Sequence, residues 1–351
     1  MMMKAAIYRG VGQIGVESVP VPELSPGDLL LRVKAASICA TDHKIVTRGH
    51  FKIPQGSTRV LGHELVGEIV AGSEAYADLA TGMRVGVAPN VGCGRCSACV
   101  QGLDNLCPAY DALGITLDGA LAEYVRIPAA FVERGNVVPV GGDVSDEEVA
   151  LIEPASCVLA AHEAVGTRSG DRVLVVGAGP MGLINVLYAR MAGAGIVVAV
   201  DPLEARRQIA RSLGADAAVS PEEVPVALEQ YTGGGGFDVV IVSVPVREAQ
   251  EQAIHQAAVQ GRIHLFAGLP KGAPLPTLDT NAIHYRQIMV TGTTGASARQ
   301  YWRTAQLVAQ RRLVLAPLVS QQIALEQVAG IFTTAPSPSQ LKVVVHPGLS
   351  K

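Results

Sequence analysis

The sequence predicts an α/β protein, in which a doubly wound parallel sheet is joined to a second, β-rich domain. Three observations lead to this expectation: the length of the chain, a glycine-rich turn between two buried strands, and a first half of short strand-like segments. The chain has 351 residues, and at roughly 100–200 residues per domain this length favours two domains. Apolar residues make up 49% of the chain and charged residues 17%, which is enough apolar material for a large core.

The glycine-rich turn belongs to a β-α-β unit over residues 171–201. The run RVLVV is continuously apolar, as is typical of a parallel strand buried on both faces, and IVVAV is a second such strand. Between them lies G-x-G-x-x-G, followed by an apolar helical pattern, and in this context the motif binds a dinucleotide. The glycines let a pyrophosphate approach the backbone at a helix N-terminus. The predicted contacts in the turn are Gly177, Gly179, Pro180, Met181 and Gly182.

An acidic residue, Asp201, ends the second strand 24 positions after Gly177. Its carboxylate is suited to accept hydrogen bonds from the adenosine ribose and repels a 2′-phosphate, which favours NAD over NADP. Arg206 and Arg207 follow closely. Because a guanidinium accepts a 2′-phosphate, NADP stays open as the less favoured cofactor. A β-α-β unit that binds no ligand is the remaining alternative.

Further strands and helices alternate after this unit, with strands expected at 237–244, 262–269 and 288–294 and helices near 203–213 and 246–259. This alternation predicts a parallel sheet that binds its ligand at the carboxyl ends of the strands. Ser243, Gly268 and Thr293 stand at those ends. We therefore expect them to be cofactor neighbours.

Residues 1–150 have a different pattern. Short strand-like segments such as DLLLRVKAAS, VGEIVAGS and RVGVAP are separated by Pro and Gly, which favours a compact, barrel-like β-rich domain. Beyond about residue 295 the tail holds a helix candidate, ARQYWRTAQLVAQRR, and then a strand, LKVVVHP. The tail is too short for a domain of its own, and we expect it to fold back onto the first domain.

Four of the six cysteines are spaced C-x2-C-x2-C-x7-C, namely Cys93, Cys96, Cys99 and Cys107. Thiolates at this spacing close a tetrahedral shell around zinc and leave no open position. Disulfides are disfavoured because neighbours this close would form strained rings. An iron–sulfur cluster stays open, since spacing alone does not identify the metal. A closed shell cannot bind substrate, so the interpretation is a structural lobe.

A second set of ligand types is spread along the chain: Cys39 in ASICATDHK, His63 and Glu64 in LGHELVGEIV, and Glu153 in IEPAS. Thiolate, imidazole and carboxylates together suit a zinc site with a position left open for water or substrate. Taken singly, each residue has an ordinary structural explanation: a small buried cysteine, a hydrogen-bonded core histidine or a glutamate at a helix start. Only the combination points to a catalytic metal.

In this order, Cys39, GHE, the four-cysteine lobe, Glu153-Pro154 and GAGPMG resemble the zinc-dependent medium-chain dehydrogenases over essentially the whole chain. Within this family the chain resembles the sorbitol and threonine dehydrogenases more than the ethanol-type enzymes. It has a glutamate in IEPAS, where ethanol-type enzymes have a cysteine ligand. The resemblance implies a GroES-like catalytic domain over 1–152 with a zinc lobe at about 90–108. It also implies a Rossmann NAD-binding domain over 153–290 and a segment, 291–351, that returns to the catalytic domain.

The resemblance also implies roles for individual residues. Cys39, His63 and Glu64 would ligate a catalytic zinc, and Glu153 would be the fourth ligand, directly or through water. Thr41 corresponds to the hydroxyl residue that begins the proton relay. Relatives usually have a histidine five residues after the ligand cysteine, where this chain has Lys44, with His43 one place earlier. This departure leaves the relay beyond Thr41, and the assignment to threonine, open.

The expected activity is NAD-linked oxidation of a secondary alcohol, such as a polyol, to a ketone, with two zinc ions per chain. A sugar-phosphate or amino-alcohol dehydrogenase is the alternative enzyme, and a basic loop, TRGHFK, would suit an anionic substrate if it faced the cleft. A solvated loop is the simpler reading of these residues. A catalytically silent binding protein of the same fold is the alternative from another class.

The expected partners are few. The net charge is −3 with no basic run, so neither nucleic acid nor an anionic membrane is expected as a partner. No apolar run reaches the about 18 residues of a membrane-spanning helix, and the first residues do not resemble a signal peptide. We expect a cytoplasmic homo-oligomer, a tetramer or a dimer.

Overall fold

A computed structural model describes residues 1–334, 337 and 339–349. The chain divides into two compact units, one comprising Met1–Ser156 with Ala296–Lys351 and the other Cys157–Gly295. The boundaries suggested by the sequence, after residues 152 and 290, stay a proposal for where independently folding domains begin. No helix among the described residues has the length and apolarity needed to cross a membrane.

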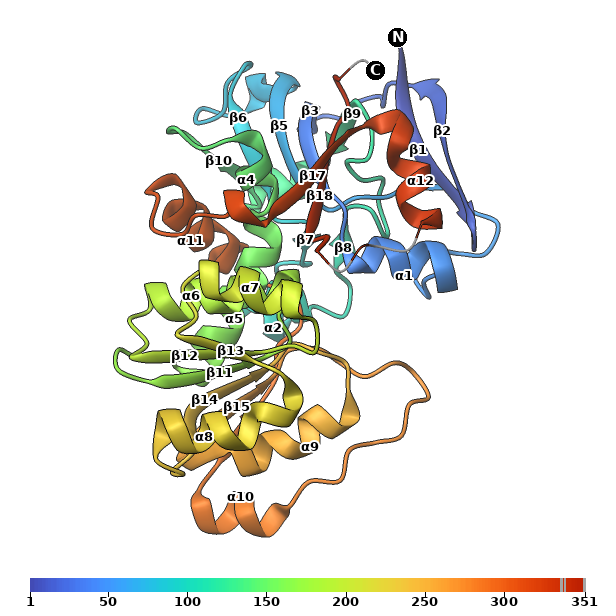
Figure 1. Cartoon of the computed structure of the whole chain (residues 1–351). Helices are drawn as coiled ribbons and strands as arrows, with labels where there is room; N and C mark the ends of the chain where they lie inside the picture. The colour runs from blue at the N-terminus through green and yellow to red at the C-terminus, as the bar shows by residue number, and fades with distance from the viewer. Residues whose placement is uncertain (335–336, 338, 350–351) are drawn as a thin grey trace. The chain divides into compact units, whose positions relative to one another are not determined.

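The first unit is built mainly from antiparallel strands (Figure 1). One sheet has the order β2-β1-β4, a larger one has the order β10-β6-β5-β3-β18-β17 with β9 paired to β3, and β7 pairs with β8. The strands are β1 (Met2–Gly10), β2 (Gln13–Pro20), β3 (Leu29–Ser37), β4 (Arg59–Val60), β5 (Glu64–Ala71), β6 (Arg84–Val87), β7 (Asn90–Val91), β8 (Asp111–Ala112), β9 (Tyr124–Ile127), β10 (Val137–Pro139), β17 (Val319–Ala324) and β18 (Lys342–His346).

Short helices connect these strands: α1 (Ala40–Arg48), α2 (Ser97–Val100), α3 (Ala129–Glu133), α4 (Asp146–Ala150), α11 (Ala298–Ala309) and α12 (Val328–Thr333), with 3-10 turns η1 (Ser73–Ala75), η2 (Asp104–Leu106), η4 (Ala316–Leu318) and η5 (Leu325–Gln327). The helix α5 (Ile152–Val165) contains the boundary between the units. An apolar core fills the space between the sheets, with Leu31, Ile69 and Leu121 among its fully buried members.

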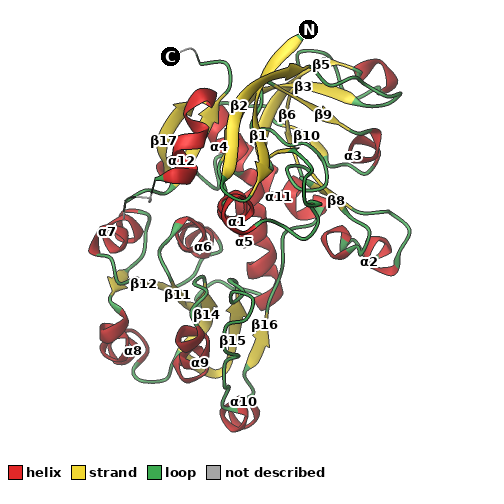
Figure 2. Ribbon diagram, turned by 90° about the vertical axis from the view of Figure 1, so that its right-hand side faces the viewer, coloured by secondary structure: helices red, strands yellow, loops and turns green. Residues whose placement is uncertain are grey.

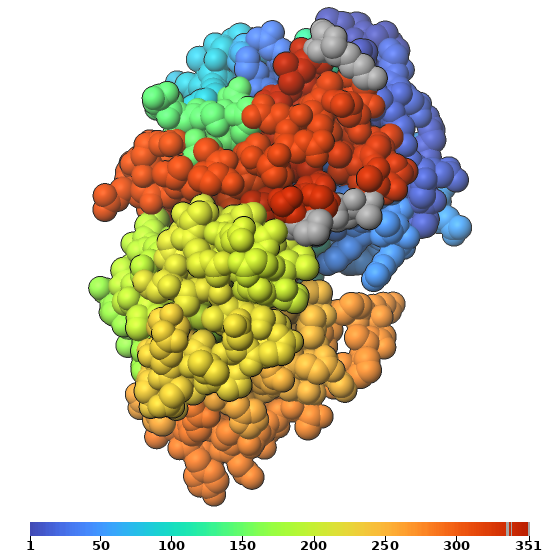
Figure 3. All heavy atoms as spheres, viewed as in Figure 1, coloured from blue at the N-terminus to red at the C-terminus, as the bar shows by residue number. Residues whose placement is uncertain are grey.

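The tail of the chain contributes a central strand to the first unit. Val344 and Val345 of β18 pair with Ser37 and Ala36 of β3 in antiparallel register. In Figure 3 the C-terminal segment, orange to red, lies over the blue and green parts of this unit. β18 lies between β3 and β17, and its residues Lys342 to Val345 are all buried, so their side chains are available to a buried site.

The second unit confirms the predicted α/β class. Its six-stranded sheet is parallel throughout and has the order β13-β12-β11-β14-β15-β16. Figure 2 shows α6 and α7 on one face of the sheet and α8, α9 and α10 on the other. The elements are β11 (Arg172–Val176), α6 (Pro180–Met191), β12 (Ile196–Val200), α7 (Glu204–Ser212), β13 (Ala217–Val219), η3 (Pro221–Glu223), α8 (Val224–Thr232), β14 (Phe237–Val242), α9 (Arg247–Gln256), β15 (Ala257–Leu265), α10 (Thr280–Arg286) and β16 (Met289–Thr291).

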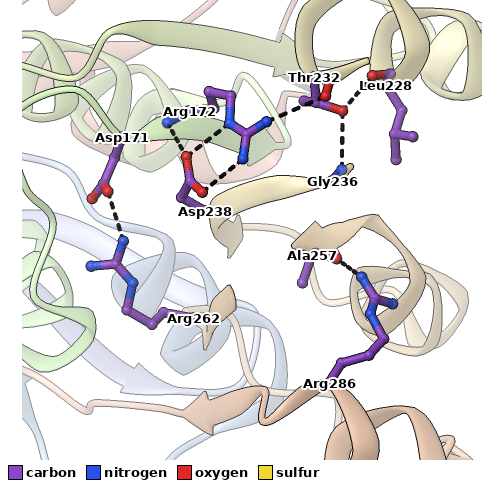
Figure 4. Close-up of polar contacts among 9 residues, drawn as sticks. All are labelled: Asp171, Arg172, Leu228, Thr232, Gly236, Asp238, Ala257, Arg262 and Arg286. Atoms are coloured by element: carbon purple, nitrogen blue, oxygen red, sulfur yellow. Dashed lines mark hydrogen bonds and ion pairs between the residues drawn. The ribbon is translucent and has the colours of Figure 1, made fainter. Parts of the chain in front are cut away.

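The amino ends of these strands are held by arginines (Figure 4). Arg172, which opens β11, makes a two-pronged ion pair with Asp238 of β14, with N···O distances of 2.9 Å. Arg262 of β15 pairs with Asp171 at 2.8 Å. The planar guanidinium suits such paired contacts. These bonds fix the end of the sheet opposite the carboxyl ends at which a ligand is expected.

The strand β15 begins earlier than the sequence suggested. Residues up to 259 were expected to be helical, but β15 starts at Ala257, and its register with β14 shifts between Phe237 and Val239. The cause is a close backbone approach: a Cβ on Gly236 would lie 2.5 Å from the carbonyl oxygen of Ala257. This contact depends on the fold around Gly236, so the local helical pattern gave no sign of it.

Candidate functional site

Three of the four predicted open-site ligands meet in the first unit. Cys39 lies at the N-cap of α1, just after β3, while Glu64 opens β5. Ser37 of β3 pairs with Glu64 of β5, so this register brings Cys39 beside His63. The ligand atoms of Cys39, His63 and Glu64 all lie within 4.8 Å of one another. A thiolate, an imidazole and a carboxylate at this spacing fit zinc.

The turn before these ligands requires glycine. Gly62 has φ of 94°, in the left-handed region. A Cβ there would lie 2.8 Å from Cγ of Leu121 and 3.0 Å from its backbone nitrogen. A side chain at this position would therefore displace the strand end that carries His63 and Glu64.

A residue that the sequence analysis missed, Asp42, supports the site from behind. It is fully buried in the first turn of α1 and accepts hydrogen bonds from the backbone N–H groups of Cys39 (2.9 Å) and Gly62 (3.3 Å). Its Oδ1 lies 3.6 Å from Nδ1 of His63. Burial favours a raised pKa for Asp42, but His63 and the hydrogen bonds outweigh burial and lower the pKa. An ionised carboxylate behind a ligating histidine fixes the orientation of the ring.

The electrostatics of His63 also fit a metal ligand. Burial favours a lowered pKa for this imidazole, but Asp42 and Cys39 outweigh it and raise the pKa well above its usual value. The same negative surroundings attract a metal cation. Because a proton must leave the imidazole before a metal binds, metal affinity falls as the pH falls.

A second missed residue, Lys342 of β18, is a buried cation at the site. Its Nζ lies 2.5 Å from Oε2 and 2.8 Å from Oε1 of Glu64, and it donates to the carbonyl oxygen of Ile38 at 3.3 Å. Burial favours a lower pKa for Lys342, but Glu64, Cys39 and Glu153 outweigh it and raise the pKa. The lysine therefore stays charged and offsets the negative ligands. A lysine that opens the otherwise apolar run KVVV was the only sign of it in the sequence.

Glu153, in the first turn of α5, is buried but lies outside the group of three ligands. Burial is the largest influence on the pKa values of Lys342 and Tyr301, and the negative charge of Glu153 helps to raise both of them. Thr41 is half-buried in the first turn of α1, and Lys44 is exposed. The ring of His43 lies 4.8 Å from that of Phe332, and its pKa is lowered chiefly by burial. The structure thus brings three predicted ligands together and places Glu153 near the same lysine.

The four-cysteine lobe is also formed. The sulfurs of Cys93, Cys96, Cys99 and Cys107 all lie within 4.8 Å of one another, and none of the six cysteines, all in the described part of the chain, is in a disulfide. A Cβ on Gly92 would lie 2.5 Å from Sγ of Cys99, so this position needs glycine. Backbone N–H groups of Arg95 and Cys96 lower the pKa of Cys93 to about 6. This set of thiols fits a closed zinc shell.

The basic loop is only partly solvated. Arg48 ends α1 and is exposed, but Nζ of Lys52 lies 3.2 Å from the ring centroid of Tyr110 and donates to the carbonyl oxygen of Tyr110 at 3.2 Å. A cation over an aromatic face is attracted by the ring. Lys52 is therefore engaged by the loop that follows the cysteine lobe.

The glycine-rich turn of the second unit has the expected packing. A Cβ on Gly182 would lie 1.7 Å from the carbonyl oxygen of Gly177, so this glycine is needed where helix meets strand. Gly179 is the N-cap of α6, and Pro180 is its first residue. Chain neighbours aside, the guanidinium of Arg206, at 3.9 Å, is the one described group within 4 Å of a Cβ placed on Gly179, which leaves room for a ligand at the helix N-terminus.

A cavity of about 380 Å³ lies next to this turn, at the carboxyl ends of β11, β12 and β14. Buried Asp201 lines it and accepts hydrogen bonds from the backbone N–H groups of Ala178 (2.9 Å) and Leu203 (3.0 Å). Arg206 approaches Asp201 to 3.8 Å. Apolar side chains, including Val224 and Val244, form much of the remaining wall. A buried carboxylate beside an apolar wall is the chemistry expected of an adenosine site.

The other expected cofactor neighbours lie further along the same edge of the sheet. Ser243 follows β14, and Thr293 lies two residues after β16, with its hydroxyl 3.2 Å from Nε2 of His264. A Cβ on Gly268 would meet nothing within 4 Å, so this position borders open space. Their contact with a cofactor stays a prediction.

Comparison with known proteins agrees with both units. Residues 25–139 match the alcohol dehydrogenase GroES-like domain, and residues 180–310 match the zinc-binding dehydrogenase family. Fold and ligand sets together define a zinc-binding dehydrogenase. The L-threonine 3-dehydrogenase of Symbiobacterium thermophilum is 36% identical over 345 residues, covering 95% of this chain and 94% of the relative. The chain belongs to the zinc-dependent medium-chain dehydrogenases and is an oxidoreductase that acts on alcohols.

Solved structures show the same architecture. A zinc-binding dehydrogenase from Sinorhizobium meliloti 1021, bound to NADP, has a TM-score of 0.90 and 33% identity, covering 99% of this chain and all of that one. The 2R,3R-butanediol dehydrogenase of Bacillus subtilis has a TM-score of 0.89 and 27% identity, with 99% and 100% coverage. The relatives thus include enzymes named for threonine and for a diol.

Proposed function

We propose that the chain oxidises a secondary alcohol to a ketone with one catalytic zinc, one structural zinc and a nicotinamide cofactor. The observation that carries this proposal is the convergence of Cys39, His63 and Glu64 within 4.8 Å of one another, backed by buried charges of both signs. When bound, zinc supplies a Lewis acid that lowers the pKa of an alcohol, and the nicotinamide supplies a hydride acceptor.

The residues of the first unit would divide the work between holding the metal and moving a proton. Cys39, His63 and Glu64 would hold the zinc, and Glu153 would complete the set directly or through water. Lys342 contacts both carboxylate oxygens of Glu64, so it would limit how far Glu64 moves toward or away from the metal. Thr41, half-buried two residues after Cys39, would accept the hydroxyl proton of the alcohol and pass it outward.

The four cysteines from Cys93 to Cys107 would hold the second zinc. A shell of four thiolates leaves no position for substrate, so this ion would stabilise its loop and take no part in the reaction.

NAD is the proposed cofactor, and NADP is the competitor. Buried Asp201 at the end of β12 supports NAD, since a carboxylate there repels a 2′-phosphate. Arg206, 3.8 Å from Asp201, supports the competitor, as does the NADP bound in the Sinorhizobium meliloti relative. The ion pair favours NAD, because it partly neutralises the guanidinium that a 2′-phosphate would need.

The substrate would be a small secondary alcohol, with a polyol first and an amino alcohol second. The curated relatives named for L-threonine favour the amino alcohol, and the butanediol dehydrogenase favours the diol. A sugar phosphate has less support, because Lys52 is engaged by Tyr110. A silent binding protein also has less support, because no ligand type is missing from the open set.

A cytoplasmic homotetramer, or a dimer, is the proposed state. Six cysteines without a disulfide suit a reducing compartment. The strand β16 is an edge of the six-stranded sheet, and within the described part of the chain it pairs with β15 alone. Met289, its first residue, is 41% exposed. An unpaired strand edge of this kind is a natural place for a second copy to bind.

A substrate panel on zinc-loaded protein would test the function. Polyols, diols, L-threonine and sugar phosphates would each be offered with NAD and with NADP, while the absorbance of the reduced cofactor is followed. We expect turnover of an unphosphorylated secondary alcohol with NAD and about two zinc ions per chain. Zinc-free protein that turned over equally well, or zinc-loaded protein that turned over none of these alcohols, would contradict the proposal.

A further inference from the structure

The second unit contains a buried cluster of three polar residues that are distant from one another in the sequence. His162 comes from α5, Asn185 from α6 and His264 from β15, and their exposed fractions are 2%, 0% and 0%. Asn185 and His264 both lie close enough to His162 to affect its pKa. The ring of His162 also lies 4.4 Å from that of Tyr188 of α6. The three residues of this cluster take no part in the proposed metal or adenosine sites.

The cluster lies on the α6 face of the sheet. Ile263 packs with Ala253 and Ile254 of α9 in the core on the opposite face. Because neighbouring side chains of a strand point to opposite faces, His264 points toward α6. The other buried side chains of α6 are apolar, among them Leu183, Val186 and Ala189. The cluster is therefore a polar patch within an otherwise apolar packing.

Two members of the cluster contact the loops at the carboxyl ends of the strands. Nε2 of His264 lies 3.2 Å from the hydroxyl of Thr293, which follows β16. Nδ2 of Asn185 donates to the hydroxyl of Ser243, which follows β14, at 3.4 Å, and to the carbonyl oxygen of Met181 at 2.8 Å. Each contact joins a buried side chain to a loop that borders the expected cofactor.

The strand order indicates which part of the cofactor these loops border. The adenosine cavity lies at β12, and the glycine-rich turn that suits the pyrophosphate follows β11. The next strands in the sheet are β14, β15 and β16. A dinucleotide that continues along the carboxyl ends therefore places its nicotinamide half over Ser243 and Thr293.

The cluster destabilises the fold, which suggests that it is retained for a function. Nε2 of His162, Oδ1 of Asn185 and Nδ1 of His264 are buried and have no hydrogen-bond partner in the part of the chain that the structure describes. Asn185 does lie close enough to His162 to oppose part of its pKa shift. Burial lowers the pKa of His162 to about 3 and that of His264 to about 4, so both rings are neutral near pH 7. Unsatisfied buried polar atoms are destabilising, and an apolar layer would avoid them.

We propose that His264 and Asn185 are positioning residues for the nicotinamide half of the cofactor, with His162 behind them. His264 would hold Thr293, and Asn185 would hold Ser243, at the strand ends over which that half lies. This inference rests on the proposed function, because it takes a nicotinamide dinucleotide as the ligand. A cluster with this role affects the binding of one half of the cofactor and not the other, whereas a cluster that only packs the core would not distinguish the two halves.

The test compares two ligands that differ only in that half. NADH and ADP-ribose share the adenosine and pyrophosphate, but ADP-ribose lacks nicotinamide. Their dissociation constants would be measured by titration calorimetry on the full zinc-loaded chain. For His264→Leu we expect the dissociation constant of NADH to rise about three- to tenfold, the loss of one positioned hydrogen bond, with that of ADP-ribose changed less than about twofold.

Matched variants separate positioning from damage. His255→Leu changes an exposed histidine of the same unit and should alter neither constant. His264→Gln keeps a polar atom for Thr293 and should recover most of the NADH affinity. If His264→Leu does not fold, Thr293→Val removes the same contact from its other side and serves as the test. Thr293→Val should weaken the binding of NADH. Its effect should not add to that of His264→Leu, because both variants remove the same contact.

The outcomes are distinct. If the dissociation constants of NADH and ADP-ribose rose in parallel, or if neither rose, the cluster would have a packing role and the proposal would be overturned. Additive effects of His264→Leu and Thr293→Val would overturn the link through Thr293. If the wild-type chain bound ADP-ribose but not NADH, the cofactor of the proposed function would be wrong, a failure that these variants do not produce.

Discussion

The two cysteine-containing sites of the first unit are built in opposite ways. The lobe of Cys93, Cys96, Cys99 and Cys107 takes all its ligands from one short loop, and three of them are partly exposed. The open set of Cys39, His63 and Glu64 draws on separate segments and is largely buried, with Asp42 and Lys342 as charged neighbours. A local loop of thiolates needs little from the rest of the fold. A buried site of mixed ligands needs the fold to supply both geometry and charge.

The same substitution in the two sites should therefore have opposite consequences. Cys39→Ser should lower turnover on the order of a thousandfold, because the metal that activates the alcohol is lost or misplaced, while the chain still folds and binds NADH. Cys96→Ser should instead lower the melting temperature first, since a structural zinc contributes to folding directly. Turnover, zinc content and thermal unfolding of both variants check this.

One combination of results for these two variants would contradict the assignment of the sites. A Cys96→Ser protein that melts like the wild type and is inactive, beside an active Cys39→Ser protein, would mean that the two sites have been interchanged.

The charge balance of the open set gives the next largest effect. Lys342→Met keeps the length of the side chain but leaves the carboxylate of Glu64 buried without its cation. Breaking one partner of a buried ion pair costs about 3–5 kcal/mol, and chemical denaturation of metal-free protein would measure it. Lys34→Met is the control, because Lys34 of β3 has a partly exposed side chain and pairs with Glu68 of β5 at 3.5 Å, so its loss should cost less than about 1 kcal/mol. Equal losses would show that Lys342 does not offset a buried charge.

The sequence predicted which candidate ligands would lie together better than it predicted the charged residues around them, although Glu153 lies outside the group of three. Cys39, His63 and Glu64 were recognised because their residue types and order are unusual, and the lobe because its spacing is local. Asp42 and Lys342 were missed for a physical reason. Asp42 looks like an ordinary acid in a first helical turn, and Lys342 acquires its role only because β18 pairs with β3, some 300 residues earlier in the chain.

The same distinction holds for the fold. The alternation of apolar strands and helices predicted the parallel sheet of the second unit, because that pattern is written locally along the chain. It did not predict the early start of β15, which depends on the contact between Gly236 and Ala257. Nor did it predict the cluster of His162, Asn185 and His264, since three isolated polar residues meet only after folding.

The support behind His63 should have a smaller effect. Asp42→Asn keeps the shape of the side chain but removes the negative charge 3.6 Å from the imidazole. Loss of such a partner typically lowers metal affinity about 10- to 100-fold. Competition with a chelator would measure release of the two zinc ions separately, and we expect only the catalytic zinc to be released more readily.

Asp118→Asn is a fair control for this change. Asp118 also accepts a backbone N–H group, that of Val60, and pairs with an arginine, but it belongs to neither ligand set. If both variants released zinc alike, the role given to Asp42 would be wrong.

The smallest effect concerns how the lobe is joined to the rest of its unit. Asp104, between the third and fourth cysteines, accepts the backbone N–H group of Ala298 at 3.2 Å, at the first turn of α11. A carboxylate at a helix N-terminus stabilises by about 1 kcal/mol, so Asp104→Ala should lower the free energy of unfolding by that amount. Asp279→Ala removes a comparable cap from α10 in the second unit, where Asp279 accepts from Ala282 at 2.9 Å. We expect similar losses of stability from both, but faster release of the lobe zinc only from Asp104→Ala. Equal zinc release would mean that the lobe keeps its metal without help from α11, which would make it still more self-contained than the open site.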